Sequence, residues 1–153
     1  MSRSPSATAH PVPDLARWLT GLWELQRTLA DGDGAPLGTF LGVLEVRPDG
    51  PGRAVATERG VLHHGGDRLD ATRTLHHELH DDGTVTVRFD HGGVFHHLDL
   101  RDGVCDVVHP CAADTYRGRT EVIDADTWLQ TWRVSGPTKA YTSVTRATRR
   151  HEA

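Results

Sequence analysis

Cysteine is scarce in this chain of 153 residues, where only Cys105 and Cys111 occur and neither belongs to a Cys-x-x-Cys motif. A framework of several disulfides is therefore excluded. Two thiols without such a motif are typical of a protein from a reducing compartment, so we expect two free thiols and a cytoplasmic location. A single disulfide between them stays open as the alternative. A chain of this length can bury a core without covalent staples.

Long apolar runs are also absent, and no stretch approaches the roughly 20 residues that span a bilayer. Residues 1–13 lack the apolar segment of a secretory leader, and we expect them to form a disordered tail ahead of one domain at 14–150. The formal net charge of −4 offers no broad attraction to nucleic acid or anionic membranes. We therefore expect a monomer or homodimer with no nucleic-acid or membrane partner.

Lysine is almost missing: Lys139 is the only one, and the other basic residues are arginines. This usage, together with abundant Ala, Gly and Asp, is typical of a GC-rich bacterial genome such as that of an actinobacterium. Histidine, in contrast, is abundant, with 11 residues. Neither a fold nor solubility requires so many imidazoles, so they draw attention as candidate functional groups.

Helix signals are limited to residues 13–21, where Asp14 can cap a short helix that Gly21 ends. The rest of the chain alternates with a period of two and is divided by Gly-, Asp- and Pro-rich turns, which predicts about ten strands. An all-β, single antiparallel up-and-down barrel is the expected fold, with a sandwich second. The predicted strands are 22–29, 38–46, 53–64, 69–79, 84–90, 93–100, 104–109, 115–122, 127–134 and 139–149.

Two His-His pairs lie on predicted strands, and alternation sends the two rings of each pair to opposite faces. His96 shares a face with Val94, Leu98 and Leu100, whereas His97 shares the other with Phe95 and Asp99. By the same rule His77 lies with Leu75 and Leu79, and His76 with Glu78 and His80. We therefore predict that His96 and His77 face the interior and that His97, His76 and His80 are solvated.

The first strand opens with Gly-Leu-Trp at 21–23, and the last carries Arg146 and Arg149. A G-x-W motif with an arginine stacked on its indole resembles the closure of calycin barrels, the class of the lipocalins and nitrobindins. Three further motifs resemble the DUF6314 family of calycin-like barrels, whose function is unknown. They are an F-x-D-G-x-x-FH hairpin, an H-x-C-x-x-D-x-Y segment and a W-x-V-x-GP-x-K-x-Y ending. Their positions here are Phe89, Asp90, Phe95 and His96; His109, Cys111, Asp114 and Tyr116; and Trp132, Val134, Gly136, Pro137, Lys139 and Tyr141.

The resemblance covers roughly residues 20–147 and implies the barrel fold but no activity. Trp23 with Arg27, and Glu58 with Gly60, also fit the family. The sequence departs from it in a His-Gly-Gly turn and in a lack of aromatics around 71–73, which predicts a roomier cavity.

Candidate catalytic residues are those that can exchange a proton near neutral pH: His96, His77, His109 and Tyr116. We place "HPCAADTY", residues 109–116, in a loop at the barrel mouth. There Cys111, His109 and Asp114 could form a nucleophile with its base, Cys and His could bind a metal, or the segment could be a structural turn.

Candidate ligand-binding residues are Arg27, Glu58, Asp114, Trp132, Lys139 and Tyr141. Inward charges must be paired or must serve a ligand. Arg27 and Glu58 are therefore predicted either to pair with each other or to anchor a carboxylate or phenolate. For Lys139 a charge at the barrel rim is preferred over Schiff-base chemistry.

We expect a small-molecule site in the barrel lumen, because a carrier of purely apolar ligands would not need inward titratable groups. The preferred hypothesis is an acid/base enzyme, an isomerase, cyclase or lyase, that acts on a hydrophobic or aromatic bacterial metabolite of secondary metabolism. A non-catalytic carrier or sensor is the alternative. A haem- or metal-binding barrel is the second alternative, although no cofactor and no metal ligands are expected.

Overall fold

Turn residues divide the chain into ten strands and one short helix, as predicted, in a computed structural model that describes residues 9–151. The all-β prediction is confirmed. The elements are α1 (Leu15–Leu19), β1 (Gly21–Asp31), β2 (Pro36–Pro48), β3 (Arg53–His64), β4 (Asp67–Leu79), β5 (Val85–Phe89), β6 (Val94–Leu98), β7 (Val104–Cys111), β8 (Asp114–Asp124), β9 (Thr127–Ser135) and β10 (Ala140–Arg149). Among the described residues no helix is long and apolar enough to cross a membrane.

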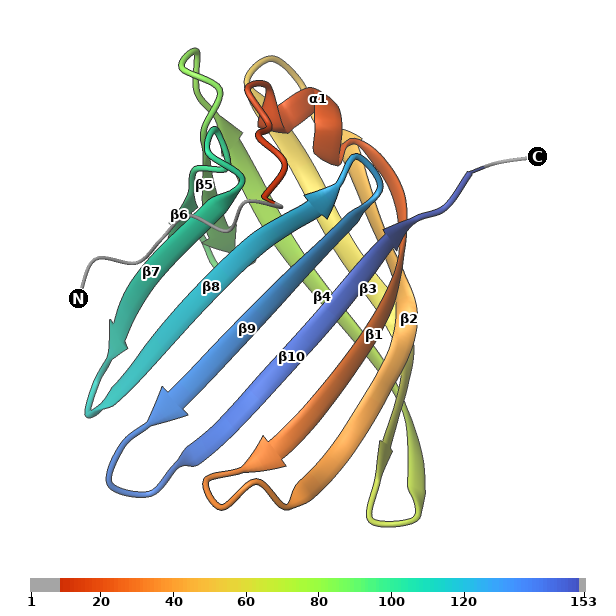
Figure 1. Cartoon of the computed structure of the whole chain (residues 1–153), viewed down its shortest axis with the longest axis vertical. Coiled ribbons are helices and arrows are strands. Elements are labelled where there is room, and N and C mark those ends of the chain that lie inside the picture. Colours follow the sequence, from red (N-terminus) through yellow and green to blue (C-terminus); the bar gives the residue numbers. More distant parts are fainter. Residues whose placement is uncertain (1–8, 152–153) are drawn as a thin grey trace.

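The strands form one antiparallel sheet that curves into a nearly closed barrel (Figure 1). Strands that are consecutive in the chain pair with each other except β6 and β7, and β1 pairs with β10, so the sheet order runs from β6 through β1 and β10 to β7. The up-and-down topology is confirmed, and the alternative of two packed sheets is wrong. The sheet order ends at β6 and β7, so the barrel has a seam there without strand pairing among the described residues.

One barrel end is closed by α1, which lies across it in Figure 1. Asp14 caps the helix by accepting a hydrogen bond from the Arg17 backbone N–H, and Leu15 and Leu19 are buried. Trp23 is fully buried beneath the helix, and the Arg149 guanidinium lies 4.3 Å from the centre of its ring. The predicted closure by indole and arginine is confirmed, with Arg149 as the arginine.

The chain before the helix also packs against the barrel. The backbone N–H groups of His10 and Val12 donate to the carbonyl groups of Val122 and Leu100, and Val12 is buried. Residues 1–8 of the predicted tail lie outside the described residues. The packed domain therefore begins before the predicted boundary at residue 14, because the side chain of Val12 contributes to the apolar core.

A β-bulge changes the inward face of β6. The pairing of β5 with β6 shifts between Val87 and Arg88, so that Val87 faces His96 while Arg88 faces Val94. Phe95 is the extra residue, and both Phe95 and His96 are buried while His97 is exposed. The predicted positions of His96 and His97 are confirmed. The prediction that Phe95 shares the outer face with His97 is wrong, because an inserted residue breaks strict alternation.

Candidate functional site

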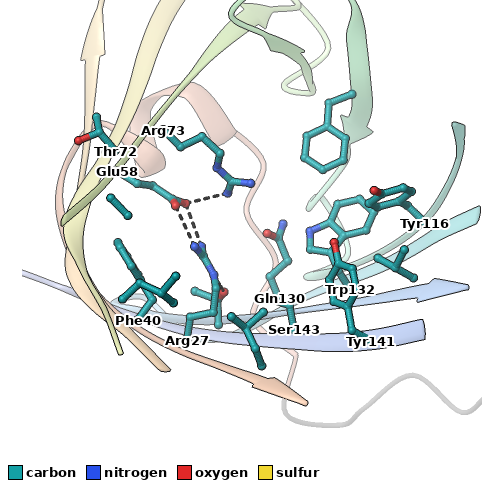
Figure 2. Close-up of a pocket in the computed structure, with 16 residues that line it drawn as sticks. Arg27, Phe40, Glu58, Thr72, Arg73, Tyr116, Gln130, Trp132, Tyr141 and Ser143 are labelled. Atoms are coloured by element: carbon teal, nitrogen blue, oxygen red, sulfur yellow. Dashed lines mark hydrogen bonds and ion pairs between the residues drawn. The ribbon is translucent and has the colours of Figure 1, made fainter. Parts of the chain in front are cut away.

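The barrel encloses a cavity of about 310 Å³ that combines charged and aromatic side chains (Figure 2). Its residues come from strands on both sides of the barrel, from β1 to β4 and from β6 and β8 to β10. They are Arg27, Leu29, Phe40, Glu58, Leu62, Ala71, Thr72, Arg73, Phe95, Tyr116, Gln130, Trp132, Val134, Tyr141, Ser143 and Thr145. Residues 71–73, where the expected aromatics are missing, thus line the cavity.

Glu58 lies between two arginines on one wall of the cavity. Both of its oxygens accept hydrogen bonds from Arg27 at 3.0 Å, and Oε2 also accepts one from Arg73 at 2.9 Å. Burial by itself raises the pKa of Glu58, but the hydrogen bonds and charges of the two arginines outweigh it and leave the pKa below its usual value. Glu58 is therefore a carboxylate near neutral pH, and the predicted internal pair of Arg27 and Glu58 is confirmed.

The two arginines differ in how many of their N–H groups are used. Arg27 donates two bonds to Glu58 and one, from Nε, to the Thr145 hydroxyl at 2.7 Å. Arg73 donates a single bond to Glu58 among the described residues, and 44% of its side chain is exposed. Arg73 therefore keeps N–H groups available to a ligand. Arg73 is not among the site residues predicted from the sequence, although it stands directly opposite Glu58 on the neighbouring strand.

Aromatic rings form the opposite wall. The rings of Phe95 and Trp132 stack with centroids 4.8 Å apart and an angle of 18° between their planes. A Cβ on Gly118 would lie 2.6 Å from the Trp132 ring, so only glycine lets the indole lie flat against β8. Tyr116 and Tyr141 line the same side in Figure 2. Trp132, Tyr141 and Tyr116 were all predicted site residues.

Tyr141 keeps its proton at neutral pH. Burial raises the pKa of its phenol, and the charge and hydrogen bond of Tyr116 raise it further. The phenol therefore offers an O–H donor rather than an anion. It adds no negative charge to the cavity.

A smaller chamber of about 60 Å³ lies toward α1 and holds His77 and His96. Glu58, Arg73, Phe95 and Gln130 line both spaces, so the chamber adjoins the main cavity. Burial lowers the pKa of both imidazoles to about 4. The charge of His76 lowers the pKa of His77 further. The backbone contact with His97 raises the pKa of His96, but it offsets only part of the effect of burial. Both rings are neutral near pH 7, and their predicted inward orientation is confirmed.

The histidines of the outer face bond to polar groups there. His76 Nε2 lies 2.8 Å from Asp90, and the Thr86 hydroxyl lies 2.7 Å from His80 and 3.0 Å from His97. His76 and His97 therefore lie on the faces of β4 and β6 opposite to those of His77 and His96.

The segment 109–116 is not a loop, because β7 continues to Cys111 and β8 begins at Asp114. At the barrel rim, Asp114 Oδ2 lies 3.6 Å from Lys139 Nζ. Cys111 is exposed. The His109 ring contacts the rings of Phe89, Phe95 and Tyr116. His109 therefore contacts rings rather than the thiol, and the described residues show no hydrogen bond that joins Cys111, His109 and Asp114 as a nucleophile set. Within residues 9–151, no three His, Cys, Asp or Glu side chains gather as metal ligands.

The closed end with its Trp23–Arg149 stack, the up-and-down topology and the lined lumen define a calycin-like barrel. A family model matches residues 19–149, and the chain belongs to that family, the family of unknown function DUF6314. Comparison with curated proteins finds no match in sequence.

Solved structures are similar in fold. The S-type phycobiliprotein lyase CPES from Guillardia theta has a TM-score of 0.69 at 11% identity, over 94% of this chain and 95% of that one. Rv2717c from M. tuberculosis has a TM-score of 0.53 at 11% identity, over 93% and 100%. At such identities the likeness establishes the fold alone.

Proposed function

We propose that the lumen binds a small aromatic molecule that carries an anionic group. The observation that supports this most is the placement of Arg73, which turns unused N–H groups toward a cavity whose opposite wall is aromatic. The volume of about 310 Å³ suits a small ligand.

The charge balance of the cavity favours an anion. Arg27 and Arg73 face the single carboxylate of Glu58, so one positive charge stays uncompensated among the lining residues. A ligand carboxylate or phenolate at Arg73 would compensate it and gain charge-assisted hydrogen bonds. Phe95 is stacked between Phe89 and Trp132, and Gly118 lies against the Trp132 indole, so this wall offers mainly ring edges to the cavity. Ring edges suit edge-to-face contact with a planar aromatic body.

The test is a calorimetric titration at pH 7 with two probes of one shape, 2-naphthoate and the uncharged 2-naphthylmethanol. We expect the acid to bind at least tenfold more tightly, since hydrogen bonds to charged groups contribute about 1.5–3 kcal/mol. Arg73→Gln should remove this preference. Arg88→Gln, which alters an arginine paired with Glu78, is the matched control and should keep it. Equal affinity for both probes would refute the anionic specificity.

Acid/base catalysis on such a ligand stays a prediction, favoured by one observation: His77 lines the inner chamber without a hydrogen bond to any described residue. A neutral imidazole can accept a proton, although a pKa of about 4 makes it a weak base at pH 7. The tautomerisation of phenylpyruvate, followed by ultraviolet absorbance, tests this function. Acceleration that His77→Phe removes would support an enzyme, whereas binding without acceleration favours a carrier or sensor.

A further inference from the structure

The inner chamber is largely apolar, yet a few polar side chains reach it. The polar lining residues stand among leucines, tryptophans and Val87, and they are Glu58, Arg73, His77, His96, Thr120 and Gln130. The Gln130 amide donates to the Thr120 hydroxyl at 3.0 Å, so those two groups partly satisfy each other. The two histidines do not pair in this way.

His77 and His96 are nearly unbonded although each is only 8% exposed. His77 forms no hydrogen bond with any described residue. His96 has one long contact, 3.4 Å from Nδ1 to the His97 carbonyl oxygen, and its Nε2 has no hydrogen bond to a described residue. Buried polar groups are normally hydrogen-bonded, because an unsatisfied one loses its interaction with water. Among the described residues, the one fully buried side-chain N or O atom without a hydrogen-bond partner is Trp128 Nε1, and Trp128 lines the same chamber. An unpaired indole N–H and two weakly bonded imidazoles around one chamber therefore point to a bound polar group.

Charge and hydrogen-bond chemistry limit what that group can be. A neutral imidazole presents one N–H donor and one acceptor nitrogen, which matches a hydroxyl group that also donates and accepts. A second anion is disfavoured, because the Glu58 carboxylate lines the chamber and most of the remaining lining is hydrocarbon. An uncharged hydroxyl fits both conditions.

Building on the proposed function, we propose that the ligand is a hydroxylated aromatic acid, with its carboxylate at Arg73 and its hydroxyl at His77 and His96. Arg73 and His77 lie on the same face of β4, four residues apart, which is about 13 Å between their Cα atoms. The side chains of Arg73 and His77 both extend into the lumen, so their polar ends can lie closer together than their Cα atoms. A two-ring aromatic acid has a length that suits this shorter separation. The aromatic wall of Phe95 and Trp132 would contact the rings between the two ends.

The experiment compares 6-hydroxy-2-naphthoate with 2-naphthoate, which differ only in a hydroxyl at the end opposite the carboxylate. Dissociation constants are measured by calorimetry at pH 7 for the wild type, His77→Phe, His96→Phe and His97→Phe. The ratio of the two dissociation constants within each protein isolates the contribution of the hydroxyl to affinity. Any general loss of affinity in a variant therefore cancels. His97 lies on the outer face beside His96 and supplies the matched control.

We expect the hydroxyl to tighten binding to the wild type about five- to tenfold, the range of a net hydrogen bond. His77→Phe and His96→Phe should each reduce the ratio toward one, whereas His97→Phe should keep it. If both acids bind equally well to every protein, the hydroxyl subsite is refuted while the anionic aromatic site stands. If neither acid binds, the proposed function fails as well. If a histidine variant does not fold, saturation-transfer NMR on the wild type decides, because the proton next to the hydroxyl should then lie nearest the imidazoles.

Discussion

Acidification from pH 7 to pH 5 should destabilise this protein through its two buried histidines. Burial lowers the pKa of His77 and His96 from 6.5 to about 4 in the folded state, whereas both return to about 6.5 when the chain unfolds. Between these values the unfolded chain binds more protons, so the free energy of unfolding decreases as the pH falls. The linkage relation gives a loss of about 2 kcal/mol per histidine between pH 7 and pH 5, and at most about 4 kcal/mol for both.

Urea unfolding followed by tryptophan fluorescence at the two pH values measures this loss. Carboxylates with a lowered pKa, such as Glu58, lose their contribution mainly below their ordinary value of 4.5, so they do not dominate at pH 5. His77→Phe should shrink the pH effect by about 2 kcal/mol, and the exposed His63→Gln should leave it unchanged. Equal stability of the wild type at pH 7 and pH 5 would refute the assignment of two buried neutral imidazoles.

Three substitutions test the packing around the cavity. Trp23→Ala should cost roughly 3–5 kcal/mol in chemical denaturation, since Trp23 is fully buried; a loss under about 1 kcal/mol would contradict its role in closing the barrel. Glu58→Gln leaves Arg27 buried without its carboxylate and should cost about 3 kcal/mol, measured in the same way; an unchanged midpoint would show that the pair is dispensable. Gly118→Ala should displace the Trp132 ring, so we expect a changed Trp132 fluorescence and weaker binding of 2-naphthoate; unaltered binding would argue against that ring as part of the site.

The features of the site that could be predicted are those that depend on local pattern. Alternation along single strands placed His77 and His96 inside and His97 outside. The cost of burying a lone charge predicted that Arg27 and Glu58 either pair or hold a ligand, and the structure shows the pair. Arg73 was missed because its position opposite Glu58 depends on the register of β4 against β3, which no local pattern encodes. Phe95 was placed on the wrong face because a bulge has no clear mark in the sequence.

The amino-acid sequence by itself determined the class of fold, because period-two hydrophobicity, turn residues and the G-x-W motif all act within a few residues of one another. It also determined the number of strands and most of the residues that could carry chemistry, although not Arg73. Only the tertiary structure decided which of them meet. Strands distant in the chain bring Arg73, Trp132 and Phe95 around one cavity, while His109, Cys111 and Asp114, neighbours in sequence, do not combine into a reactive set. Closure of the barrel is a non-local event, so the composition of its lumen depends on register, on bulges and on how far each side chain reaches across it.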